Sequence, residues 1–122
     1  MSVTYAEETP VHNPASVERK IEETINRIAA GVSVVTAAER EARAKKREFD
    51  LAYAHAYKRA EGPVHERRYE ADIMTMAQRE ASDIAEIAYR HAERTARAVE
   101  KELIAWQSIS SSIRVMYGAV RT

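Results

Sequence analysis

Residues 60–66 read AEGPVHE, and this stretch decides how the chain folds. Gly62 can adopt the left-handed conformation that commonly ends a helix, and Pro63 cannot continue a preceding helix. We therefore predict a turn at residues 61–64 between two helical segments. Because the turn is short, the segments should run antiparallel, with residues equidistant from Gly62 facing each other.

The first helical segment is predicted to begin at Asn13, which can cap a helix, and Pro14, which is favoured at the first helical position. Apolar residues then recur at spacings of three and four residues, as on one face of an α-helix. This predicted stripe contains Val17, Ile21, Ile25, Ile28, Val32, Val35, Ala38 and Ala42, and it resumes at Phe49, Tyr53, Ala56 and Ala60. Residues 1–12 lack such periodicity and are predicted to form a flexible arm.

A break in the first segment is an open question at Gly31. Gly31 could close one helix, and Thr36 with Glu39 could form a capping box that opens another. Because the stripe keeps its phase from Ile28 through Val35, we favour one kinked helix.

The second helical segment follows Val64. Its predicted stripe contains Ile73, Ala77, Ala81, Ile84, Ala88, Ala92, Ala96, Val99, Leu103, Trp106, Ser110 and Ile113. The mean spacing of about 3.6 residues is that of a straight helix face. We predict an all-α fold in which residues 13–122 form one long, coiled-coil-like helical hairpin.

The composition favours association with other chains. The chain has 122 residues, of which 22 are alanine and two are leucine, so two helices alone would have a thin core. We expect a homo-oligomeric bundle or a protein partner. Small residues allow close helix packing, and the predicted interface residues are Ala92, Ala96, Val99, Leu103, Trp106, Ser110, Ile113 and Tyr117.

The sequence lacks the signatures of most enzymes and cofactor sites. The stretch from His65 to Tyr69, HERRY, begins like a zinc-protease motif but lacks its second histidine. Carboxylates such as Glu39 and Glu93 precede Arg43 and Arg97 by four residues, as on a solvated helix surface. We predict a non-enzymatic protein with no metal and no cofactor. The absence of cysteine and of a long apolar run favours a cytoplasmic protein without membrane contact.

Two basic features could bind a polyanion, although the net charge is zero. One is RAKKR, residues 43–47. The other is a row formed by Arg90, Arg94, Arg97 and Lys101, whose spacings place them along one helix edge. With Arg114 and the aromatic residues Trp106 and Tyr117, this row could contact single-stranded DNA. The alternative interpretation is that the charges form a solvated face and the serines of residues 108–112 form a tight helix seam.

Two stretches carry a family resemblance. They are FDLAYAHAYKRAEGPVHERRYEADI and AERTARAVEKELIAWQSISSSIR, within Arg43 to Arg114. The chain resembles small helical proteins encoded by tailed bacteriophages and prophages, often among early genes for recombination and replication. The resemblance implies an accessory role in the host cytoplasm, such as assisting a single-strand annealing or binding protein, without catalytic residues. A virion or host-interaction adaptor with no nucleic-acid role is the alternative.

Overall fold

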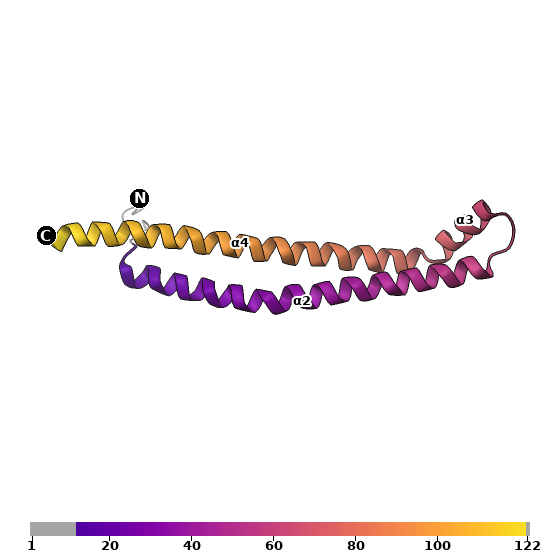
Figure 1. Cartoon of the computed structure of the whole chain (residues 1–122), viewed down its shortest axis with the longest axis horizontal. Coiled ribbons are helices and arrows are strands. Elements are labelled where there is room, and N and C mark those ends of the chain that lie inside the picture. Colours follow the sequence, from indigo (N-terminus) through magenta and orange to yellow (C-terminus); the bar gives the residue numbers. More distant parts are fainter. Residues whose placement is uncertain (1–11, 122) are drawn as a thin grey trace, which may run out of the picture. The chain divides into compact units, whose positions relative to one another are not determined.

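The computed structural model describes residues 12–121 and contains three α-helices in that range. They are α2, Pro14–Arg59; α3, Val64–Met74; and α4, Met76–Arg121. The described residues form no β-strand, and α2 packs against α4 as the two arms of a hairpin (Figure 1). The predicted all-α antiparallel helical hairpin is therefore confirmed. Apart from His12, the predicted N-terminal arm lies outside the described residues.

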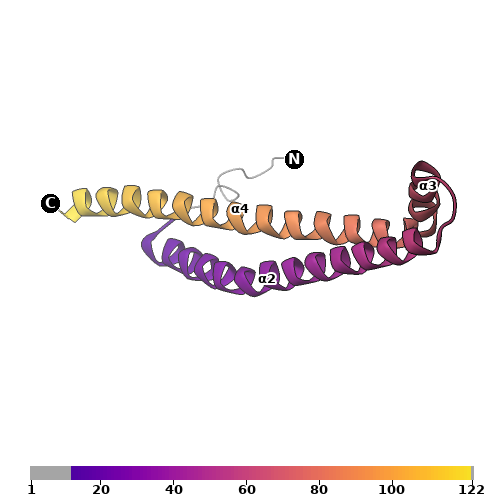
Figure 2. The same cartoon turned by 45° about the vertical axis from the view of Figure 1, so that its right-hand side comes forward.

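The contacts within the chain divide it into two compact units. Among the described residues, unit 1 consists of residues 12–29 and 97–121, and unit 2 is Ala30–Ala96. Unit 1 thus pairs the first part of α2 with the last part of α4. Unit 2 contains the second part of α2, the turn, α3 and the first part of α4 (Figure 2).

The start of α2 is capped as the sequence predicts. The Ser16 backbone N–H donates to Asn13 Oδ1 at 2.9 Å, and the Asn13 backbone N–H donates to Ser16 Oγ at 3.1 Å. These reciprocal hydrogen bonds satisfy backbone donors that have no partner within the helix. Pro14 at the first helical position loses no hydrogen bond.

The helix α2 passes through Gly31 without a break, in agreement with the favoured single helix. Thr36 does not cap a second helix, because its hydroxyl donates to the carbonyl oxygen of Val32 at 2.9 Å. A threonine that bonds back to the preceding turn is compatible with a helix interior.

The turn is placed as predicted, within one residue. The helix α2 ends at Arg59 and α3 begins at Val64. Gly62 has a φ of +103°, which residues with a Cβ rarely adopt. Glycine at this position allows the chain to reverse.

The second helical segment is broken at Thr75, which the sequence analysis did not predict. Thr75 has φ −113° and ψ 17°, outside helical geometry, and separates α3 from α4. Its hydroxyl is buried and donates to the carbonyl oxygen of Ala71 at 2.6 Å. As a result α3 lies at an angle to α4 in both ribbon views (Figures 1 and 2).

The buried face of α2 differs from the predicted stripe at two positions. Ile25 and Val32 are exposed, whereas Thr24 is buried and Gly31 is half-buried. The covered residues follow a strict seven-residue repeat, which keeps one helix face against a packed neighbour. Because the predicted stripe was drawn through the bulkiest residues, it departs from this seven-residue repeat at Ile25.

The same correction applies to the first part of α4 and the end of α3. The predicted stripe residues Ile73, Ala77, Ile84 and Ala88 are exposed, and the buried residues before Ala92 are instead Ala71, Thr75 and Ala85. From Ala92 onward the predicted stripe and the buried face coincide. Before Ala92 the stripe was wrong because it followed Ile73, Ile84 and the alanines in phase with them, whereas the buried positions lie on another side of the helix.

Candidate interaction surface

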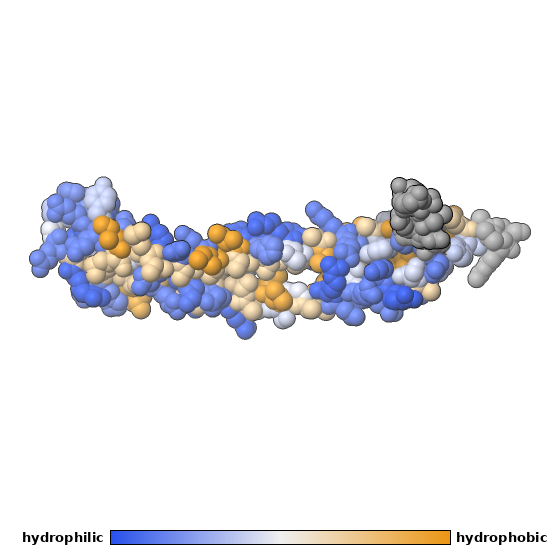
Figure 3. Space-filling model, turned by 180° about the vertical axis from the view of Figure 1, so that it is seen from behind, coloured by the Kyte–Doolittle hydropathy of each residue, from blue (hydrophilic) through white to orange (hydrophobic). Residues whose placement is uncertain are grey.

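Large apolar side chains in unit 2 face away from the seam between α2 and α4. Ile73 is 69% exposed, Met76 64%, Ile84 61% and Ile87 65%. Helical spacing places Met76, Ile84 and Ile87 on the side of α4 opposite the buried Ala85 and Ala92, and Ile73 lies on the side of α3 opposite the buried Ala71. We call the surface formed by these four residues the outer face of unit 2. Seen from behind, apolar residues are visible at the surface of the half that contains the turn, with charged residues beside them (Figure 3).

Charged residues on the same side of α4 are segregated along the helix. Glu80 and Asp83 precede the two isoleucines, and Arg90, His91 and Arg94 follow them. All five are exposed. The outer face therefore has an acidic part, an apolar centre and a basic part, in that order.

The predicted basic row lies on the surface of α4, as its spacing indicated. Arg90, Arg94, Arg97 and Lys101 are all exposed. Arg90 Nε donates to Glu86 Oε2 at 2.6 Å, and this hydrogen bond raises the pKa of the Arg90 guanidinium. Arg94, Arg97 and Lys101 form no ion pair with another described residue. Two of these cations, Arg97 and Lys101, belong to unit 1.

Arg114 does not share the environment of the row. Its Nη2 donates to Ser110 Oγ at 3.1 Å, and Ser110 is buried at the seam. The guanidinium is thus drawn toward the side of α4 that packs within the chain.

The residues predicted as an interface lie mostly on the inner side of α4. Ala92, Val99, Ser110 and Ile113 are buried; Ala96, Leu103 and Trp106 are half-buried; Tyr117 is exposed. In unit 1, the Trp106 ring meets the His12 ring edge-on, with a centroid distance of 5.4 Å. The described chain itself thus covers much of this surface.

A polar network crosses the seam of unit 1 at Glu102. Arg27 Nη1 donates to Glu102 Oε2 at 2.7 Å, and the hydroxyl of the buried Thr24 lies 3.2 Å from the same oxygen. Partial burial raises the pKa of Glu102, but the hydrogen bonds from Arg27 and Thr24 outweigh it, so that the pKa is lowered overall. The network holds a carboxylate, and therefore a charge, beside the helix seam.

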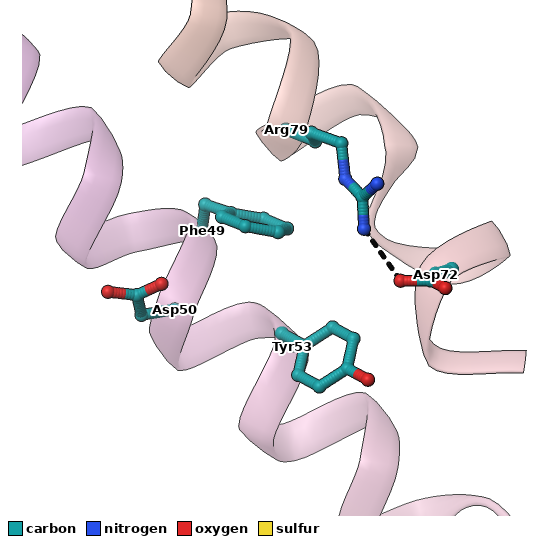
Figure 4. Close-up of a pocket in the computed structure, with 5 residues that line it drawn as sticks. All are labelled: Phe49, Asp50, Tyr53, Asp72 and Arg79. Carbon is teal, nitrogen blue, oxygen red and sulfur yellow. Dashed lines mark hydrogen bonds and ion pairs between the residues drawn. The ribbon is translucent and has the colours of Figure 1, made fainter. Parts of the chain in front are cut away.

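An aromatic cluster in unit 2 was not predicted. Phe49, Tyr53 and Tyr57 lie along one side of α2: the Phe49 ring meets the Tyr53 ring edge-on at a centroid distance of 6.2 Å, and Tyr53 stacks on Tyr57 at 6.4 Å. The guanidinium of Arg79 lies 5.3 Å from the centre of the Phe49 ring, and Arg79 Nη2 donates to Asp72 Oδ1 at 2.6 Å (Figure 4).

Phe49, Tyr53, Asp72 and Arg79, together with Asp50, border a shallow hollow of about 340 Å³. The bond from Asp72 to Arg79 joins α3 to α4 across the break at Thr75. The cluster therefore fixes the turn end of unit 2 by a cation–π contact and an ion pair. The four-residue spacing of the aromatics was visible in the sequence, but Arg79 could be assigned to them only once the break was known.

No metal-binding group is present in the part of the chain that the structure describes: no three His, Cys, Asp or Glu side chains there could hold an ion. None of the helices in residues 14–121 has the length and apolarity needed to cross a membrane. Comparisons with protein-family models, curated proteins and solved structures gave no match.

Proposed function

We propose that this protein is a non-enzymatic cytoplasmic accessory protein that acts through protein–protein contacts on the outer face of unit 2. The observation that supports this proposal is the exposure of Ile73, Met76, Ile84 and Ile87 beside a seam of alanines. Exposed apolar residues are unremarkable singly, but several on one helix face, as Met76, Ile84 and Ile87 are on α4, are typical of a surface that another helix covers.

A site-specific photo-crosslinker tests this function. Replacing Ile87 by benzoylphenylalanine should give a protein adduct on illumination of the cells that make this protein. The matched control carries the same group at Ile104, which is 62% exposed in unit 1. The adduct should be identified by mass spectrometry, remade with purified protein and abolished by Ile84→Glu. Equal adducts at both positions, or none, would contradict the proposal.

Single-stranded DNA binding is a second candidate function, supported by the exposed Arg97 and Lys101 of unit 1. Neither cation is engaged by a carboxylate among the described residues, so both could contact phosphates. This function would suit the role in phage recombination or replication that the sequence resemblance implies. That role remains a prediction, and an assembly or host-interaction adaptor without nucleic acid is its alternative.

Fluorescence anisotropy with labelled oligothymidine distinguishes these two roles. Binding at low salt should weaken in Arg97→Ala/Lys101→Ala, and the slope of log affinity against log salt should fall by about 0.7 for each phosphate that the variant no longer neutralises. The control Arg19→Ala/Lys20→Ala removes the same charge from exposed positions of α2. If both pairs behave alike, or if no binding occurs at low salt, the adaptor without nucleic acid is favoured.

A further inference from the structure

The outer face of unit 2 has a charge order that suits pairing with a copy of itself. Glu80 and Asp83 lie on the N-terminal side of Ile84 and Ile87, and cations lie on the C-terminal side. When two such helices run antiparallel, the acidic part of each lies against the basic part of the other. When they run parallel, like charges face each other, which opposes association.

We propose that a second copy of this chain docks antiparallel on the outer face of unit 2, with a two-fold axis between Ile84 and Ile87. This inference rests on the proposed protein-contact function and names its partner. In a two-fold interface the same patch contacts itself, so each contact occurs twice. Ile84 then packs on the partner's Ile87, and Ile87 on the partner's Ile84.

The helical repeat determines the neighbouring contacts once the central pair is set. Glu80 lies one helical turn before Ile84, and the partner's His91 lies one turn after the partner's Ile87, so Glu80 faces the partner's His91. Beside the apolar centre, Asp83 comes within reach of the partner's Arg90, whose guanidinium also bonds to Glu86 of its own chain. Each symmetric interface thus carries four pairs of an acidic with a basic residue around four isoleucines, and no pair joins like charges.

The inner seam of unit 2 explains why the isoleucines are available. Its buried residues are Ala42, Ala56, Ala60, Ala71, Thr75, Ala85 and Ala92. Small side chains at these buried positions allow α2 and α4 to lie close together, and Ile84 and Ile87 of α4 lie outside that seam. In a dimer the partner's outer face would cover the apolar side chains of α4 that the hairpin leaves exposed.

Sedimentation equilibrium of the full chain tests this association. The wild type should have twice the 13.8 kDa mass of one chain, and Ile84→Glu/Ile87→Glu should have the mass of one chain with unchanged helicity. The control Ile104→Glu/Val115→Glu places the same charges at exposed apolar positions of unit 1 and should remain dimeric. A double variant at 84 and 87 that stays dimeric would overturn the inference, since the interface would then lie elsewhere.

Disulfide trapping tests the orientation, because the chain has no cysteine of its own. A mixture of Ile84→Cys and Ile87→Cys chains, oxidised together, should give mainly the mixed disulfide between the two variants. A parallel dimer would instead crosslink each variant to itself, and that result would overturn the proposed geometry.

The outcomes separate this inference from the function on which it rests. If the wild type is monomeric up to millimolar concentration and the crosslinker at 87 still marks another protein, the second copy is the wrong partner and the protein-contact function stands. If the wild type is monomeric and position 87 gives no adduct, both proposals are wrong.

Discussion

Unit 1 and unit 2 use the same helices but bury side chains of different size. In unit 1 the buried positions include Val17, Val99 and Ile113. In unit 2 they are alanines and Thr75, and the isoleucines of α4 are exposed. Unit 1 therefore buries larger apolar side chains within the chain than unit 2 does, while both units leave some large apolar side chains exposed.

The polar contacts between the helices also differ between the two units. In unit 1 Glu102 accepts from Thr24 and Arg27 beside a buried seam. In unit 2 Arg79 lies over Phe49 and bonds to Asp72, at the edge of a shallow hollow. Each unit thus has a polar or cation–π contact that joins its helices and favours one way of pairing them.

The largest expected effect is in the core of unit 1. Ile113→Ala should lower the free energy of unfolding by about 2–5 kcal/mol, because it removes buried methyl groups and leaves a cavity. The exposed Ile104 of the same unit provides the control, and Ile104→Ala should change stability by less than about 0.5 kcal/mol. Urea denaturation followed by circular dichroism measures both. Equal losses would mean that the bulky residues of unit 1 do not form its core.

The seam of unit 2 should respond to added volume rather than to removed volume. Ala85→Leu should destabilise the protein by about 1–3 kcal/mol, because the larger side chain does not fit between closely packed helices. Ala88→Leu makes the same change at an exposed position three residues away and should be nearly neutral. Thermal denaturation should show the difference as a lower Tm for the first variant alone. If Ala85→Leu raised the stability instead, the seam between α2 and α4 would have space for a larger side chain.

The contrast between the units also explains how much the sequence could predict. The turn at Gly62 and Pro63, the start at Asn13 and the inner face from Ala92 to Ile113 were predicted because local chemistry and burial agree there. In unit 2 they disagree, since the buried residue is Ala85 and the exposed neighbour is Ile84. A search for apolar periodicity follows the isoleucines and therefore selects the face that points outward.

Two features of the candidate surface depended on the three-dimensional structure. The break at Thr75 has no glycine or proline to mark it, and its buried hydroxyl bond to Ala71 forms only in the folded chain. The pairing of Arg79 with Asp72 and Phe49 follows from that break. By contrast, the exposed row Arg90, Arg94, Arg97 and Lys101 followed from spacing alone, because residues three and four apart share a helix face.

Alanine substitutions at two glycines, Gly62 in the turn of unit 2 and Gly31 inside α2, test these two positions against each other. Gly62→Ala should destabilise the protein by about 1–2 kcal/mol, because a residue with a Cβ is strained at a φ of +103°. Gly31→Ala should stabilise it by about 0.5–1 kcal/mol, since nothing lies within 4 Å of the added Cβ and alanine favours the helix. Chemical denaturation of the two variants measures whether each substitution raises or lowers the free energy of unfolding. A loss of stability at Gly31 would indicate that the helix seam requires closer approach there than the structure shows.

The smallest expected effect concerns the carboxylate in the seam of unit 1. Because the folded state lowers the pKa of Glu102, the fold prefers its ionised form. This contribution is complete above the unfolded-state pKa and is lost as the pH falls through the lower folded-state value. Glu102→Gln should therefore lower the Tm at neutral pH, and its difference from the wild type should shrink as the pH falls through the lowered folded-state pKa of Glu102. Glu100→Gln removes the same charge from an exposed position two residues away and serves as the control. A Tm difference for Glu102→Gln that stays constant as the pH falls through that pKa would show that shape and hydrogen bonding, rather than the charge, are what Glu102 contributes to unit 1.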